Sequence, residues 1–114
     1  MPLVDVSYRV GVPDEQLRRM ASVLPHAVSV AVECPEEPYD GELRPGDVEV
    51  GFRERSELDV GELDVVIEVR STWLESRAAN RQQRCAHILE QVRQASGLGA
   101  IGVYLMLPVA AWSQ

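Results

Sequence analysis

Pro2 is the residue whose type and position most favour chemistry. A methionine that precedes a small residue is normally removed, and Pro2 would then carry a free secondary amine. Pro2 directly opens the alternating segment Leu3–Val10, so a strand rather than a loose tail would hold the amine. Burial and nearby cations lower the pKa of an amine, and an amine with a pKa of about 7 is a competent general base. The sequence therefore predicts that Pro2 transfers protons once Met1 is removed.

Other familiar reactive sites are not visible in the sequence. His26 and His87 fall in separate predicted helices and have no second ligand at a spacing that suits a metal. Cys34 and Cys85 stand far apart, which favours two free thiols. The run Gly97–Gly102 matches G-x-G-x-x-G, but a predicted helix precedes it and a strand follows, the reverse of a dinucleotide site. We therefore expect neither a metal nor a cofactor.

The composition describes an acidic globular chain. Its 114 residues carry 18 acidic side chains and 11 basic ones, all of them arginine, for a formal net charge of −7. A net-negative surface repels phosphate backbones, so we expect no nucleic-acid partner, and the acidity itself favours solubility. Glycines and a proline interrupt the uncharged C-terminal run, which predicts a buried strand rather than a membrane span. No signal-peptide pattern opens the chain, and we expect a cytoplasmic protein.

Four strands and two helices must position Pro2. Apolar residues alternate in the segments expected to be strands and recur at helical spacing in the others. Pro25 lies inside the first helical segment and is expected to kink or split it. The predicted elements are strand Leu3–Val10, helix Pro13–Ala31, loop Cys34–Gly46, strand Asp47–Arg55, strand Leu63–Arg70, helix Leu74–Val92 with Gly97 as its cap, and strand Ala100–Leu107.

This order predicts an α+β fold in one domain, residues 1–114, built of two β-α-β pseudo-repeats, 1–56 and 57–114. Right-handed crossovers would place both helices on one face of a four-stranded mixed sheet. The other face would be polar, which is typical of a solvated surface or of subunits that pair charges around an axis. It would carry Asp5, Ser7, Arg9, Asp47, Glu49, Arg53, Asp64, Glu68 and Arg70.

The start Pro2-Leu3-Val4, followed by two β-α-β units, resembles the tautomerase superfamily. That group includes 4-oxalocrotonate tautomerase, 5-carboxymethyl-2-hydroxymuconate isomerase, macrophage migration inhibitory factor and malonate semialdehyde decarboxylase. The resemblance implies an amino-terminal proline as catalytic base or acid and a homotrimer for a chain of fused length. It also implies chemistry without a cofactor on a small carboxylate substrate, such as an unsaturated 2-oxo acid.

The resemblance also implies roles for particular residues. Arg70 resembles an arginine that binds a substrate carboxylate, and we group Arg53 and Trp73 with it as candidate substrate-binding residues. Asp47 resembles an acid that serves decarboxylation, although a residue at a strand start is a simpler interpretation. Tyr104 resembles a tyrosine that lies near the proline, with core packing as the alternative.

One departure concerns the second arginine that the decarboxylase branch places close behind the first. In this chain Ser71, Thr72 and Trp73 follow Arg70, and the next arginine is Arg77. This difference disfavours decarboxylase and dehalogenase chemistry and favours an isomerase. Tautomerising a 2-oxo acid needs a base, a cation for the carboxylate and a donor for the enolate oxygen.

Two other functions fit the same order of elements. A ferredoxin-like α/β-barrel binding module would use the polar sheet face for a ligand and would not need Pro2. A tautomerase-fold subunit without activity would serve in binding or assembly. Retention of Met1 would block the amine and favour either of these alternatives.

Overall fold

A computed structural model describes residues 2–39, 41–44 and 47–114. Met1, whose removal would free the amine of Pro2, lies outside these residues, as do Pro45 and Gly46 in the predicted loop. The elements are β1 (Leu3–Tyr8), α1 (Asp14–Val32), β2 (Glu49–Glu54), β3 (Val65–Arg70), α2 (Glu75–Ala78), α3 (Arg81–Ser96) and β4 (Ile101–Met106). All four predicted strands are present, and each is shorter than predicted at one or both ends.

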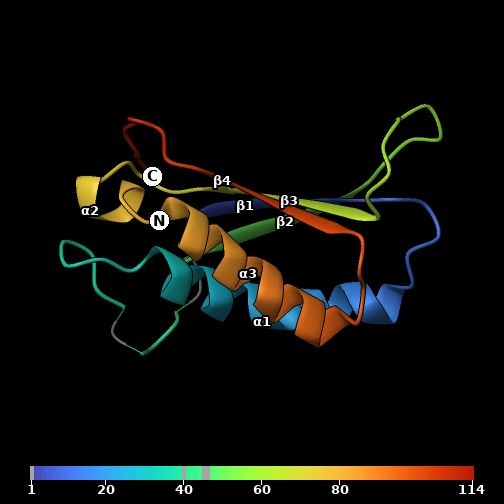
Figure 1. Cartoon of the computed structure of the whole chain (residues 1–114), viewed down its shortest axis with the longest axis horizontal. Coiled ribbons are helices and arrows are strands. Elements are labelled where there is room, and N and C mark those ends of the chain that lie inside the picture. The colour runs from blue at the N-terminus through green and yellow to red at the C-terminus, as the bar shows by residue number, and fades with distance from the viewer. Residues whose placement is uncertain (1, 40, 45–46) are drawn as a thin grey trace.

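The four strands form one mixed sheet in the order β2-β1-β3-β4. β1 pairs in parallel with β2, β3 pairs in parallel with β4, and the two halves meet where β1 runs antiparallel to β3. Figure 1 shows α1 and α3 side by side beneath the sheet, so that the helices cover one face. The predicted fold class is confirmed.

This topology excludes the ferredoxin-like alternative. In the split β-α-β arrangement another strand separates the two strands that a helix connects. Here β1 and β2 flank α1 in the chain and are direct hydrogen-bonded neighbours in the sheet, and β3 and β4 are neighbours in the same way. The polar sheet face therefore does not belong to a ferredoxin-like module.

The core lies between the sheet and the helices. Strand alternation supplies one half of it, because successive side chains point to opposite faces. Val65, Ile67 and Val69 of β3 are each 0% exposed. The other half comes from the helical stripes that the sequence predicts. The remaining buried members of this core are Val4, Val6, Met20, Leu24, Val28, Ala31, Val32, Ile88, Val92 and Ile101.

The helices differ from the prediction in two respects. Pro25 lies inside α1 without splitting it, so the chain accepts the loss of one backbone donor there. The second predicted helix is divided into α2 and α3, with Asn80 at the N-cap of α3. The Asn80 side chain does not cap α3, since its oxygen accepts a hydrogen bond of 2.6 Å from the Arg84 Nε instead. Gly97 ends α3 with a φ of 74°, as predicted.

Within the described residues, no helix combines the length and apolar character that crossing a membrane requires.

The segment between β2 and β3 extends beyond the sheet at the end opposite the two termini (Figure 1). It exposes Leu58 at 89% and Val60 at 100%. Large apolar side chains exposed to this degree are candidates for contact with another molecule.

Candidate active site

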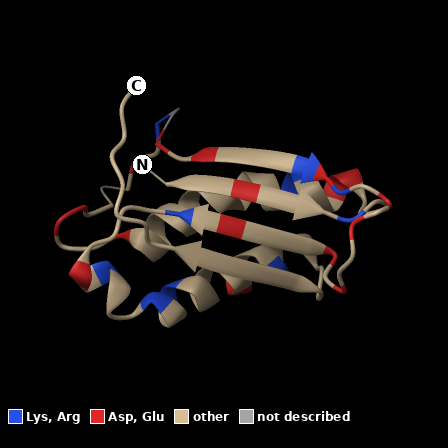
Figure 2. Ribbon diagram, turned by 90° about the horizontal axis from the view of Figure 1, so that it is seen from above, with Lys and Arg blue, Asp and Glu red and all other residues tan. Residues whose placement is uncertain are grey.

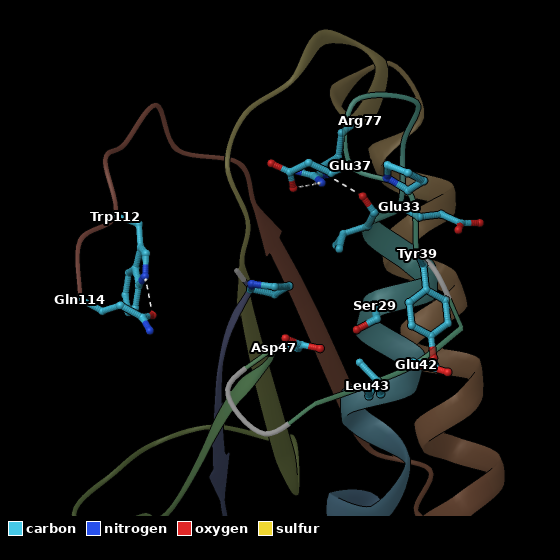
Figure 3. Close-up of a pocket in the computed structure, with 13 residues that line it drawn as sticks. Ser29, Glu33, Glu37, Tyr39, Glu42, Leu43, Asp47, Arg77, Trp112 and Gln114 are labelled. Atoms are coloured by element: carbon cyan, nitrogen blue, oxygen red, sulfur yellow. Dashed lines mark hydrogen bonds and ion pairs between the residues drawn. The ribbon is translucent and has the colours of Figure 1, made fainter.

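A cavity of about 580 Å³ lies at the N-terminal end of β1, and Pro2 is part of its wall. Four other parts of the chain complete it, namely the last turns of α1, the segment that follows α1, α2, and the C-terminal tail. Figure 3 shows Trp112 and Gln114 of the tail across the cavity from Ser29 and Tyr39. The cavity therefore joins both ends of the chain to the turn between α1 and β2.

Pro2 and Asp47 line this cavity together. The sheet fixes the backbone at Pro2, because its carbonyl oxygen accepts a hydrogen bond of 3.2 Å from the Glu49 N–H. Asp47 is held from the other side, since its carboxylate accepts a hydrogen bond of 2.7 Å from the Arg44 N–H. Two of the predicted catalytic residues are thus brought to one place.

The charge of the cavity is mostly negative. Its described lining contains one guanidinium, that of Arg77, and the carboxylates of Glu33, Glu37, Glu42 and Asp47. Nearby carboxylates favour the protonated form of an amine. A free amine at Pro2 would therefore need the guanidinium and partial burial to offset them. Among the described residues no group of His, Cys, Asp or Glu is placed to hold a metal ion.

Arg77 is the buried cation of this cavity, with an exposed fraction of 1%. Its Nε donates to the Val32 carbonyl at 2.7 Å, and one terminal nitrogen donates to the Thr72 carbonyl at 2.7 Å. The other terminal nitrogen donates to the Glu37 carboxylate at 3.0 Å, and Figure 3 shows this pair at one end of the cavity. One guanidinium therefore connects the end of α1, the start of the α2 region and the segment after α1.

A second arginine reinforces the end of α1. The Arg84 guanidinium donates to the Ala31 carbonyl at 2.9 Å and also to the Glu33 carbonyl. These carbonyls belong to the last turn and the cap of α1, where the helix itself supplies no donors. Cations at a helix C-terminus also oppose the negative end of its dipole. Arg77 and Arg84 thus supply the positive charge that the last turn of α1 lacks.

The segment after α1 has its own anchor to α2. The Ser76 hydroxyl donates to the Glu36 carboxylate at 2.7 Å. This hydrogen bond is the largest of the effects that hold the pKa of Glu36 below its ordinary value. Cys34 and Glu37 form a short antiparallel bridge that closes the turn between them. Both contacts hold the cavity wall that carries Glu37.

Aromatic side chains line the rest of the cavity. The Tyr39 hydroxyl lies 3.1 Å from Nδ1 of His26, and the two rings meet edge to face. The Trp112 indole donates to the Gln114 side chain at 3.0 Å. The Trp73 N–H donates to the Pro108 carbonyl at 3.0 Å, which joins the tail to the end of β3. The tail is therefore attached to the sheet before it reaches the cavity.

Arg70 and Arg53 lie elsewhere. Arg70 alternates with the buried residues of β3, and both arginines reach Asp5, which places them on the sheet face opposite the helices. Figure 2 shows the sheet from above, with charged residues along its strands. Arg70 donates to Asp5 at 2.8 Å and to Glu68 at 3.0 Å, and Arg53 lies 3.6 Å from the other oxygen of Asp5. The Asp5 hydrogen bond is the main reason that the pKa of Arg70 is raised. Both guanidinium groups are thus paired within the chain.

Tyr104 and Trp73 are also outside the lining of the cavity. Tyr104 is 65% exposed and pairs in register with Glu68, which places it on the same uncovered face as Arg70. The alternative of core packing is wrong for Tyr104. Trp73 is 45% exposed beside the tail. The cavity is also lined by Arg77, Tyr39 and Trp112, which belong to no motif of the sequence. The one signal for any of them is that Arg77 is the next arginine after Arg70.

Comparisons with known proteins support the fold. No protein-family model and no curated protein matches the chain. Among solved structures, a fused 4-OT described as a symmetric trimer superposes with a TM-score of 0.62 at 14% identity, over 94% of this chain and 85% of that one. Malonate semialdehyde decarboxylase gives 0.62 at 15% identity, over 97% and 88%. Pt0534 inactivated by 2-oxo-3-pentynoate gives 0.61 at 16% identity, over 93% and 85%. The chain therefore has the fold of the tautomerase superfamily.

Proposed function

We propose that this chain is a cofactor-independent tautomerase or isomerase that moves a proton on a small unsaturated 2-oxo acid. The observation that carries the proposal is that Pro2, at the start of a sheet strand, lines a cavity of about 580 Å³. The amine of Pro2 acts as the general base after removal of Met1. It takes a proton from the substrate hydroxyl or carbon and returns it to another atom of the same substrate, so no redox partner is needed.

The polar residues around the base fit this chemistry. Proton transfer by a positioned amine contributes about 10²- to 10⁴-fold to the rate. A guanidinium stabilises the carboxylate of a 2-oxo acid and the charge that develops on its enolate. Asp47 lies near the base and influences its charge state through the field of its carboxylate. The roles predicted for Tyr104, Arg70, Arg53 and Trp73 stay predictions.

A homotrimer belongs to the same proposal. The uncovered sheet face and the exposed side chains of Leu58, Val60 and Val109 are surfaces that a neighbouring copy would cover, and Val109 is 92% exposed. Copies packed around an axis would cover that face and could bring Tyr104 or Arg70 toward a neighbouring cavity. The fused 4-OT relative is a trimer, which supports this arrangement. Sedimentation at micromolar concentration should report three times the mass of one chain.

Ketonisation of phenylenolpyruvate, followed by absorbance, tests the proton transfer. Three proteins are compared: the chain with Met1 removed, its Pro2→Ala variant, and a chain whose N-terminal extension turns the amine into an amide. Pro2→Ala keeps a primary amine and should retain part of the activity, whereas the extended chain should lose about 10²- to 10⁴-fold. Equal activity in all three, or none in any folded protein, would favour a tautomerase-fold subunit without catalysis.

A further inference from the structure

We propose that the Arg77 guanidinium is the carboxylate-binding group of the Pro2 cavity and that Glu37 is a built-in carboxylate that occupies it in the free protein. The inference rests on the proposed function only for the identity of the substrate carboxylate. The ligands of the cavity are then small monocarboxylates. Such a ligand displaces the Glu37 carboxylate from Arg77 when it binds.

The first support is the way in which Arg77 is held. Its Nε and one terminal nitrogen donate to the backbone carbonyls of Val32 and Thr72, both at 2.7 Å. These neutral partners fix the plane of the guanidinium but do not neutralise its charge. A buried guanidinium requires an anionic partner, because burial of an unpaired charge is costly. That charge is therefore available to one carboxylate at the remaining nitrogen.

The second support is the contrast between the two partners of the ion pair. Arg77 is 1% exposed on its side chain, whereas Glu37 is 52% exposed. Glu37 thus reaches the guanidinium from the solvent side, and both residues line the cavity. An external carboxylate that replaces Glu37 keeps the buried guanidinium paired, while the released Glu37 carboxylate returns to water, so the exchange leaves no buried charge without a partner.

The third support is the lack of another suitable cation in the cavity. Its described lining contains no guanidinium besides that of Arg77. Arg70 and Arg53 are on the opposite sheet face, where Asp5 pairs with both. Within one chain, a carboxylate beside Pro2 therefore has Arg77 as its ion-pair partner, and an aromatic ring on that ligand would contact Tyr39 or Trp112.

Calorimetric titration with benzoate tests the exchange without any proton transfer. Glu37→Gln removes the competing carboxylate and should tighten benzoate binding about three- to fivefold over the full-length wild-type chain. Glu33→Gln is the matched control, because Glu33 lines the same cavity but has no ion pair to a described residue. It reports the general effect of removing one negative charge, and the gain should be less than half as large. Benzyl alcohol, which lacks the charge, should show no gain with Glu37→Gln.

Equal gains in Glu37→Gln and Glu33→Gln, or weaker binding in Glu37→Gln, would overturn the proposal. Absence of benzoate binding in both the wild type and Glu37→Gln would overturn it as well. Arg77→Lys keeps the charge but not the planar fork and should weaken binding at least fivefold if it folds. The Glu37 comparison decides the matter whether or not that variant folds. Benzoate binding in a chain that does not ketonise phenylenolpyruvate would refute the proposed function alone.

Discussion

The two sides of the sheet use arginine in opposite ways. On the helix side, Arg77 is buried and donates to two carbonyls and one carboxylate. On the uncovered side, Arg70 is 39% exposed and is paired with two carboxylates from β1 and β3. The Arg77 guanidinium holds the wall of a cavity together, whereas the Arg70 guanidinium pairs with carboxylates on two neighbouring strands. Residue type alone does not reveal which arginine has which role.

The largest expected difference between the two arginines is in stability. Arg77→Met leaves the Val32 and Thr72 carbonyls without their donor, and each buried unsatisfied group costs about 1–3 kcal/mol. We expect the free energy of unfolding to fall by about 2–5 kcal/mol. Arg70→Met removes two half-exposed ion pairs, to Asp5 and Glu68, and should lower the free energy of unfolding much less than Arg77→Met does. Urea denaturation measures both, and Arg18→Met, on an exposed helix pair, is the control. Equal losses of unfolding free energy in Arg77→Met and Arg70→Met would show that the buried arginine does not stabilise the fold more than the exposed one.

The second difference is kinetic. Because Arg70 is already paired away from the cavity, Arg70→Ala should change kcat/KM for phenylenolpyruvate by less than about threefold. Loss of a direct charge-assisted contact would instead lower it roughly 10- to 100-fold. A decrease of that size, with the trimer intact, would show that assembly brings the uncovered face into the active site. It would also support the substrate-binding role that the sequence predicts for Arg70.

A smaller effect concerns the pH profile. Removing the negative charge of Asp47 weakens the stabilisation of the ammonium form at Pro2, so the base becomes active at lower pH. The acid limb of the kcat/KM profile of Asp47→Asn should therefore move down by less than about one pH unit. The matched variant Asp64→Asn, on the Arg9 pair, should leave the limb in place. A shift to higher pH in Asp47→Asn would contradict the assignment of Pro2 as the titrating base.

The smallest effect is at the outer part of the cavity wall. Ser76→Ala should raise the pKa of Glu36 toward its ordinary value, because the Ser76 hydroxyl is the main cause of its lowering. Since the folded pKa is depressed, the stabilising contribution is present above the unfolded pKa and is lost as pH falls through the folded one. Carboxylate NMR titration of Glu36 measures the change. An unchanged titration would mean that the hydrogen bond does not form in solution.

The fold was predictable because its signals are local. Alternation in Val4 and Val6, the helical stripe of Met20, Leu24 and Val28, and the cap at Gly97 each follow from a short stretch of sequence. The division between α2 and α3 was missed because the apolar spacing continues across it. Asn80 stands at that boundary, but its side chain accepts a hydrogen bond from Arg84 and does not cap α3.

The candidate site was predictable only in part. Pro2 follows from its position at the chain start, and Asp47 from its position before β2. Arg77 could not be selected, because its role depends on the Val32 carbonyl and the Glu37 carboxylate, which lie 45 and 40 residues away in the sequence. The tail that carries Trp112 gives no local pattern that would point to a cavity wall. Long-range contacts of this kind are set by the packing of elements and not by the spacing of residue types.

Covalent labelling by 2-oxo-3-pentynoate tests most directly whether Pro2 presents a reactive amine in the cavity. An uncharged amine adds to the alkyne of this 2-oxo acid, forming a carbon–nitrogen bond while a proton passes to carbon. We expect one adduct per chain, mapped to Pro2 by peptide mass spectrometry, faster at higher pH and absent when an N-terminal extension blocks the amine. A folded, Met1-free chain that stays unlabelled, or carries the label only on Cys34 or Cys85, would contradict the central claim.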